Sequence, residues 1–151
     1  MKFVAIDPGK NGGIAAADVD LVIAFNMPTT PKDIYKELSS IYERGSICYL
    51  EDVGHGMPGQ SSKATATFAR HNGHVEMALL AIGYKVIKVT PAKWQKRLNV
   101  LTRKGESKTD HKNRMKEKAQ YLFPEVSVTL KTADALLLLE YALEMEQKKQ
   151  V

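Results

Sequence analysis

A short apolar run that ends in an acid and a glycine turn most constrains how this chain can fold. Residues 2–6 are Lys-Phe-Val-Ala-Ile, Asp7 follows them, and the turn Pro-Gly-Lys-Asn-Gly-Gly occupies positions 8–13. The apolar pattern predicts a strand buried on both faces, and such a strand rarely carries a carboxylate without a use for it. Asp7 is therefore a candidate metal ligand. The alternative is that Asp-Pro-Gly is only a turn signal, because each of these residues favours turns for its own backbone reason.

The rest of the chain predicts one α/β domain over residues 1–151, in which short strands alternate with helices. Three strands come first as an antiparallel meander, and Ser or Thr precedes each predicted helix as a cap. The segment 53–62 contains three glycines and is expected to be an irregular, mobile loop. This order is that of the ribonuclease H-like fold, a mixed five-stranded sheet flanked by helices. The predicted strands are 2–6, 13–18, 21–27, 46–50 and 84–89, and the predicted helices are 31–44, 63–82, 91–98, 108–123 and 133–146, with caps at Thr30, Ser62, Thr90, Ser107 and Thr132.

Two further acids repeat the situation of Asp7. Glu51 follows the apolar strand run 47–50, and Asp134 lies in the first turn of a helix whose residues 135–139 are all apolar. The simpler interpretations are a solvated acid at a strand end and an Asp that complements the helix dipole. If the strands of Asp7 and Glu51 are neighbours, however, the two like charges need a cation between them. Three acids on two strand ends and a helix start favour Mg²⁺ or Mn²⁺.

The basic residues of the chain are unevenly distributed. The net charge is +5, yet the segment 88–118 alone holds eleven lysines and arginines against three acids. A basic block on an otherwise slightly acidic domain indicates a polyanion site, with nucleic acid as the leading partner. The alternative is a solvated helix face followed by a lysine-rich loop.

Composition also indicates the compartment. We find no apolar run of the ~18 residues that a bilayer span needs, and no secretory signal pattern at the N-terminus. Cys48 is the sole cysteine, and it lies in an apolar run, which favours a buried thiol and a reducing compartment. We therefore expect a cytoplasmic protein with no membrane partner.

Three motifs around the acids resemble a known family. Ile6-Asp7-Pro8-Gly9, Leu50-Glu51-Asp52-Val53 and Ala133-Asp134-Ala135-Leu136 are similar to the three acid motifs of RuvC-type Holliday junction resolvases, in particular the small versions of bacteriophages. The resemblance runs over nearly the whole chain in the expected order. Its other points are Met57-Pro58-Gly59-Gln60, Gly73, Val89-Thr90-Pro91 with Trp94, Lys108, and Leu122-Phe123-Pro124.

The resemblance implies a ribonuclease H-like homodimer that cleaves four-way DNA junctions with two Mg²⁺ or Mn²⁺ ions per active site, in the host cytoplasm if a phage encodes it. Asp7 would bridge both metals, Glu51 would bind one and Asp134 the other. Lys108 would contact the phosphate near the cut, helped by Lys112 or Lys104. The expected DNA-binding residues are Lys96, Arg97, Arg103, Lys104, Lys108, Lys112 and Lys131.

The sequence departs from the family pattern at two places. Lys131 stands where relatives have a fourth acid or a histidine, so the second metal would be weak or completed by Asp110, His111 or water. Gly54 stands where bacterial members place a junction-stacking aromatic, and this role would then pass to another residue such as His55 or Met57.

Dimerisation and the reaction both leave alternatives open. Helix 63–82 has more apolar and small residues than one narrow stripe needs, which favours a dimer contact, although it could simply be core. A nuclease for RNA–DNA hybrids would share the fold and the acids. An actin-like ATPase also begins with a strand and Asp-x-Gly, but no further phosphate loop matches. A branched-DNA-binding module with weak cleavage is the third alternative.

Overall fold

The computed structural model describes residues 1–54 and 59–151. In this part of the chain a mixed five-stranded sheet has the strand order β3-β2-β1-β4-β5 and is flanked by helices, so the predicted fold class is confirmed. The predicted strands and helices are all found, with ends that differ by a few residues. The elements are β1 Phe3–Asp7, β2 Gly13–Ala17, β3 Val22–Asn26, α1 Pro31–Ile41, β4 Ile47–Glu51, α2 Ser62–Ile82, β5 Lys85–Val89, α3 Pro91–Arg97, α4 Lys108–Leu122 and α5 Ala133–Lys149.

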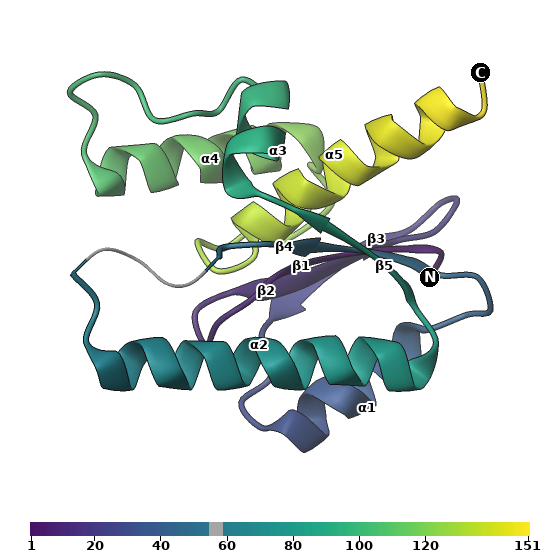
Figure 1. Cartoon of the computed structure of the whole chain (residues 1–151). Coiled ribbons are helices and arrows are strands. Elements are labelled where there is room, and N and C mark those ends of the chain that lie inside the picture. Colours follow the sequence, from purple (N-terminus) through teal and green to yellow (C-terminus); the bar gives the residue numbers. More distant parts are fainter. Residues whose placement is uncertain (55–58) are drawn as a thin grey trace.

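The central strand β1 separates two hydrophobic cores. It pairs antiparallel with β2 and parallel with β4, and its side chains alternate between the two faces of the sheet. Val4 and Ile6 enter the core beneath α1 and α2, whereas Ala5 enters the core beneath α3 and α5. Figure 1 shows α1 and α2 on one side of the sheet and the other three helices on the opposite side. By this alternation, Asp7 and Glu51 share the face that α5 covers.

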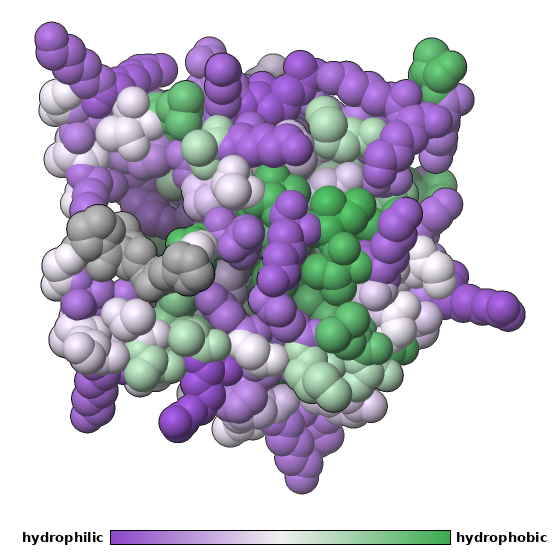
Figure 2. All heavy atoms as spheres, in the orientation of Figure 1, coloured by the Kyte–Doolittle hydropathy of each residue, from purple (hydrophilic) through white to green (hydrophobic). Residues whose placement is uncertain are grey.

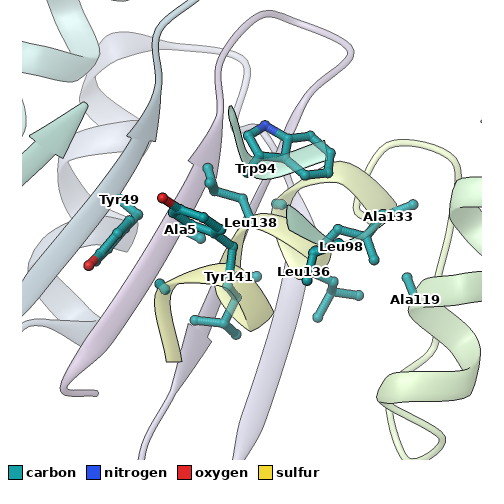
Figure 3. Packing of buried hydrophobic residues seen from close by; sticks show 14 of the residues in the cluster. Ala5, Tyr49, Trp94, Leu98, Ala119, Ala133, Leu136, Leu138 and Tyr141 are labelled. Atoms are coloured by element: carbon teal, nitrogen blue, oxygen red, sulfur yellow. The ribbon is translucent and has the colours of Figure 1, made fainter. Parts of the chain in front are cut away.

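Helix α5 is buried along most of its length. The four leucines at positions 136–139 are fully buried and belong to the same core cluster as the fully buried Trp94. Figure 3 shows two of them, Leu136 and Leu138, in this cluster. The chain entering α5 also runs very close to β2 at Gly13. A Cβ atom at Gly13 would lie 2.7 Å from the carbonyl oxygen of Lys131, so only glycine leaves room for this approach. The start of α5 is thereby placed at the end of β1.

One predicted cap is wrong by one residue, and two others lack the capping hydrogen bond. The hydroxyl of Ser61, one residue before the predicted cap Ser62, accepts the N–H of Ala64 and begins α2 one residue earlier. Thr90 and Thr132 occupy N-cap positions, but neither side chain makes a capping hydrogen bond. Thr132 instead accepts the N–H of Thr129 at 3.0 Å, which closes the turn before α5. The caps at Thr30 and Ser107 are confirmed.

The surface is mostly hydrophilic on the side seen in Figure 2, with hydrophobic side chains gathered near the edge strand β5. Lys85 and Lys88 are exposed along this strand. Lysines on an edge strand discourage pairing with the edges of other sheets. None of the helices in the described ranges is long and apolar enough to span a membrane. The predictions for His55 and Met57 lie outside the described residues.

Candidate active site

Asp7 and Glu51 are brought together by neighbouring parallel strands. Ile6 of β1 stands opposite Leu50 of β4, and the same register places the next residues, Asp7 and Glu51, side by side at the end of the sheet. Adjacent strands lie about 4.8 Å apart, so two carboxylates on the same face are close neighbours. The expectation that the strands of Asp7 and Glu51 are neighbours, so that both acids leave the same end of the sheet, is therefore confirmed.

Asp134 joins them from the first turn of α5. The residue is only 7% exposed, and its Oδ2 accepts a hydrogen bond of 2.7 Å from Nζ of Lys112 on α4. The other oxygen, Oδ1, is buried and has no hydrogen-bond partner within the described part of the chain. A buried carboxylate oxygen without a donor is costly to retain, so it indicates a position where a cation or another donor can bind.

Burial and neighbouring charges raise the pKa values of Asp7 and Glu51. Burial raises the pKa of Asp7 from 3.8 to about 8, with further increases from the charges of Asp134 and Glu51 and a partial offset by Lys112. Burial likewise raises the pKa of Glu51 to about 7. Burial, the largest single effect, lowers the pKa of Lys112, but the charge and hydrogen bond of Asp134 together with the charges of Asp7 and Glu51 outweigh it, so the net shift is upward. The three carboxylates and Lys112 therefore form one electrostatic cluster.

Trp94 orients Glu51. Its indole Nε1 donates a hydrogen bond of 2.7 Å to Oε2 of Glu51, which is 8% exposed, and this bond opposes the effect of burial on the carboxylate pKa. The sequence identified Trp94 only as a point of family resemblance. One sequence signal could have predicted this role. The Thr-Pro motif begins α3 directly after β5, and this places Trp94 near the end of the neighbouring strand β4.

The donor chemistry of the cluster suits a divalent cation. Carboxylate oxygens are the ligands that Mg²⁺ and Mn²⁺ prefer, and the buried Oδ1 of Asp134, which has no hydrogen-bond partner among the described residues, is free to bind one. The side chains are not gathered as a ligand shell. Across residues 1–54 and 59–151, no three His, Cys, Asp or Glu side chains are grouped to hold a metal ion. Binding would have to draw the carboxylates closer together.

Asp110 and His111, considered as replacements for a fourth metal ligand, have other partners. His111 Nε2 lies 2.7 Å from the carbonyl oxygen of Val100, and Asp110 accepts the hydroxyl of Ser107 at the start of α4. These contacts anchor the segment before α4 to the helix. Neither side chain is directed to the acid cluster by these bonds.

The predicted DNA-binding residues do not form one compact group. Lys112 donates a hydrogen bond to Asp134, whereas Lys108 lies one helical turn earlier on α4. Arg97 pairs with Glu144 at 2.7 Å. Glu144 is ten residues beyond Asp134 on α5, a separation of roughly 15 Å along a helix. The remaining ones, Lys96, Arg103, Lys104 and Lys131, have exposed positions.

The strand order, the two helical layers and the acids at the end of β1 and β4 define an α/β protein of ribonuclease H-like fold. The structure is similar to the Thermus thermophilus RuvC structure, with a TM-score of 0.55 and 16% sequence identity over 90% of each chain. It is also similar to T. thermophilus RuvC in complex with Holliday junction substrate, with a TM-score of 0.58, 16% identity and 90% coverage of both chains. At this identity the similarity establishes a RuvC-like fold. No protein-family model and no curated protein matches the sequence.

Proposed function

We propose that this protein is a metal-dependent endodeoxyribonuclease that binds and cleaves four-way DNA junctions. The observation that carries the proposal is the convergence of Asp7, Glu51 and Asp134 with Lys112 at one end of a sheet that has a RuvC-like fold. Acids of this kind, on a chain with a strongly basic segment, suit hydrolysis of a polyanion backbone.

Each residue of the cluster has a distinct part in the proposed reaction. Asp7, Glu51 and Asp134 would hold Mg²⁺ or Mn²⁺, which when bound supplies an activated water and positive charge for the phosphate oxygens. Trp94 fixes the orientation of Glu51 through its 2.7 Å hydrogen bond. The ammonium group of Lys112 would contact a phosphate oxygen and stabilise the charge that develops there as water attacks phosphorus and the leaving oxygen departs.

Cleavage of a mobile four-way junction tests the reaction. Purified protein should cut the junction with Mg²⁺ or Mn²⁺ and not with EDTA, and should act more weakly on linear duplex and on RNA–DNA hybrid. Asp7→Asn should lose at least about 100-fold in rate while it still binds the junction, because it removes a ligand and not a DNA contact. Asp52→Asn is the matched control, since Asp52 is exposed and adjacent to Glu51. Full cleavage by Asp7→Asn, or preferential cleavage of the hybrid, would contradict the proposal.

The basic segment would supply phosphate contacts. Junction affinity should then fall with salt, with a slope of about −0.9 for each duplex phosphate neutralised. Replacing the exposed Lys104 by Ala should reduce the magnitude of this slope by about one, whereas Lys36→Ala on α1 should leave it unchanged. Affinity that does not depend on salt would exclude this role for the segment.

The outer face of α2 suits an isologous dimer contact. Ala66, Ala69 and Gly73 are exposed along it, and Met77 and Leu80 continue the stripe with 64% and 67% of their surfaces exposed. Sedimentation should show a dimer that Leu80→Glu converts to monomer. Val19→Glu, at an exposed apolar residue in the β2–β3 turn, should leave the dimer intact. A strictly monomeric native protein would refute the dimer.

A branched-DNA-binding module with weak cleavage is the second candidate. The favouring observation is that Lys112 already pairs with Asp134, while the described residues hold no ready metal-ligand group. This candidate predicts tight junction binding with cleavage that stays slow at saturating Mn²⁺. Rapid cleavage in the assay above would reject it.

A further inference from the structure

A cavity of about 790 Å³ begins at the acid cluster and extends away from it. Asp7 and Lys112 line one end, and the rest of the wall comes from the β1–β2 turn, the start of α1 and the first half of α2. The side chains of Glu51 and Asp134 are not part of this wall. The cavity therefore lies beside the candidate active site and is distinct from the space between its three acids.

The wall combines an aromatic ring with positive charge. Phe68 of α2 is half-buried, and its ring edge lies against Gly9, where an added Cβ would be 3.3 Å from ring atom Cε2. Lys10, Lys63 and Arg70 also line the cavity, so with Lys112 four cations face one carboxylate among the described lining residues. A phosphate alone would not need the aromatic ring, and an apolar ligand would not need the cations.

His71 adds a polar group to the same wall. Its Nε2 is buried and makes no hydrogen bond within the described residues. Burial and the nearby His74 lower the pKa of His71, so the imidazole is neutral at neutral pH. A neutral imidazole can donate or accept one further hydrogen bond after a small rotation, as recognition of a heteroaromatic edge requires.

We infer that this cavity receives one unpaired nucleotide of the bound DNA, with its base against Phe68 and its phosphates among Lys10, Lys63 and Arg70. The volume lies within the range of about 300 to 1,000 Å³ that is typical of small-ligand pockets. Base–aromatic stacking and backbone cations are the two elements of single-strand recognition, and a base at a branch point is easier to unpair than one within a duplex. The nucleotide would lie next to the phosphodiester at Asp7. This inference rests on the proposed junction binding.

A coupling experiment with abasic sites tests the inference. Junction affinity is measured in EDTA, so that cleavage does not contribute, with an abasic site placed in turn at each nucleotide beside the branch point. At one position the abasic site should weaken binding by the native protein about 5- to 150-fold, and Phe68→Ala should weaken binding of the intact junction by a similar factor. The two changes together should weaken binding no further than either alone, because both remove the same contact.

Two further variants separate stacking from folding. Phe68→Leu retains apolar volume but has no ring, so it should lose affinity as Phe68→Ala does while keeping the native melting temperature. Tyr35→Ala is the matched control, because Tyr35 is a half-exposed aromatic on the neighbouring helix α1 and does not line the cavity. 2-Aminopurine at the coupled position should brighten on binding to the native protein and not to Phe68→Leu.

The outcomes distinguish failure of the nucleotide-pocket inference from failure of the proposed nuclease function. If the junction is bound and cleaved but no abasic position couples to Phe68, the nucleotide pocket is wrong and the nuclease proposal stands. If the native protein binds no junction, both are wrong. If free deoxynucleotides displace the junction at micromolar concentration, the cavity is a small-molecule site and the strand inference is overturned.

Discussion

Replacing Asp7 by Asn should make this protein more stable at alkaline pH, although it removes the central residue of the candidate active site. Burial and the negative charges of two other carboxylates raise the pKa of Asp7 from 3.8 to about 8. The folded chain therefore keeps a proton on Asp7 over a pH range in which the unfolded chain releases it. Stability from this group is full below about pH 4 and is lost as the pH rises through about 8.

The size of the effect follows from the shift. Each pKa unit corresponds to about 1.4 kcal/mol, and between about pH 5 and pH 9 a shift of this size removes up to about 4 kcal/mol from the free energy of unfolding. Asn carries no charge at either pH, so the free energy of unfolding of the variant does not decrease in this way. For a domain of this length, about 2 to 4 °C of Tm accompanies each kcal/mol, and the variant should gain up to about 8 to 16 °C over the native protein between the two pH values.

Thermal melts followed by circular dichroism in EDTA measure this gain. Asp52→Asn serves as the control, because this aspartate is exposed, and its Tm difference from the native protein should not grow with pH. Added Mg²⁺ should raise the Tm of the native protein more than that of Asp7→Asn, since a ligand that binds only the folded state stabilises it. A Tm difference that stays constant from pH 5 to pH 9, or a variant less stable at pH 9, would refute the electrostatic reasoning.

Two other substitutions test the supports of the site. Trp94→Phe removes the donor to Glu51 and should lower the free energy of unfolding by about 1 to 3 kcal/mol in urea titrations. The loss should be larger at pH 8 than at pH 5, because Glu51 has a pKa of about 7 and is mostly charged at the higher pH; equal losses would contradict a charge-assisted bond. Gly13→Ala places a Cβ 2.7 Å from the carbonyl oxygen of Lys131 and should destabilise by about 1 to 3 kcal/mol. Gly73→Ala, with no heavy atom within 4 Å of the added Cβ, should be neutral or stabilise by up to about 1 kcal/mol, and equal effects at the two glycines would exclude the close approach.

Local sequence patterns were sufficient for the sheet and for the position of two acids. The apolar runs before Asp7 and Glu51 predict buried strands, and their order predicts that β1 is central with β4 beside it. Parallel pairing then brings both strand ends to one edge. Asp134 was also predictable as a candidate, because an acid in a nearly continuous apolar helix needs a polar environment.

The lysine of the site could not be chosen from sequence. Lys108 and Lys112 are one turn apart on α4, and both lie on the same side of that helix. Which of them reaches Asp134 depends on how α4 is positioned against α5 by the packing of Met115 and Ala119. The sequence alone does not specify this tertiary packing. The cavity beside Asp7 was hidden for the same reason, since its wall joins segments that are far apart in the chain.

Helix α5 ties the candidate site to the whole domain. Its leucines at 136–139 are fully buried, and Asp134 precedes them by less than one turn. The backbone at Asp134 therefore cannot shift along or around the helix axis unless the interior rearranges with it, and only rotation of the side chain can bring its carboxylate closer to the other two. The amide hydrogens of these buried leucines should exchange only as the entire molecule opens, and inactivation by heat should coincide with unfolding instead of preceding it.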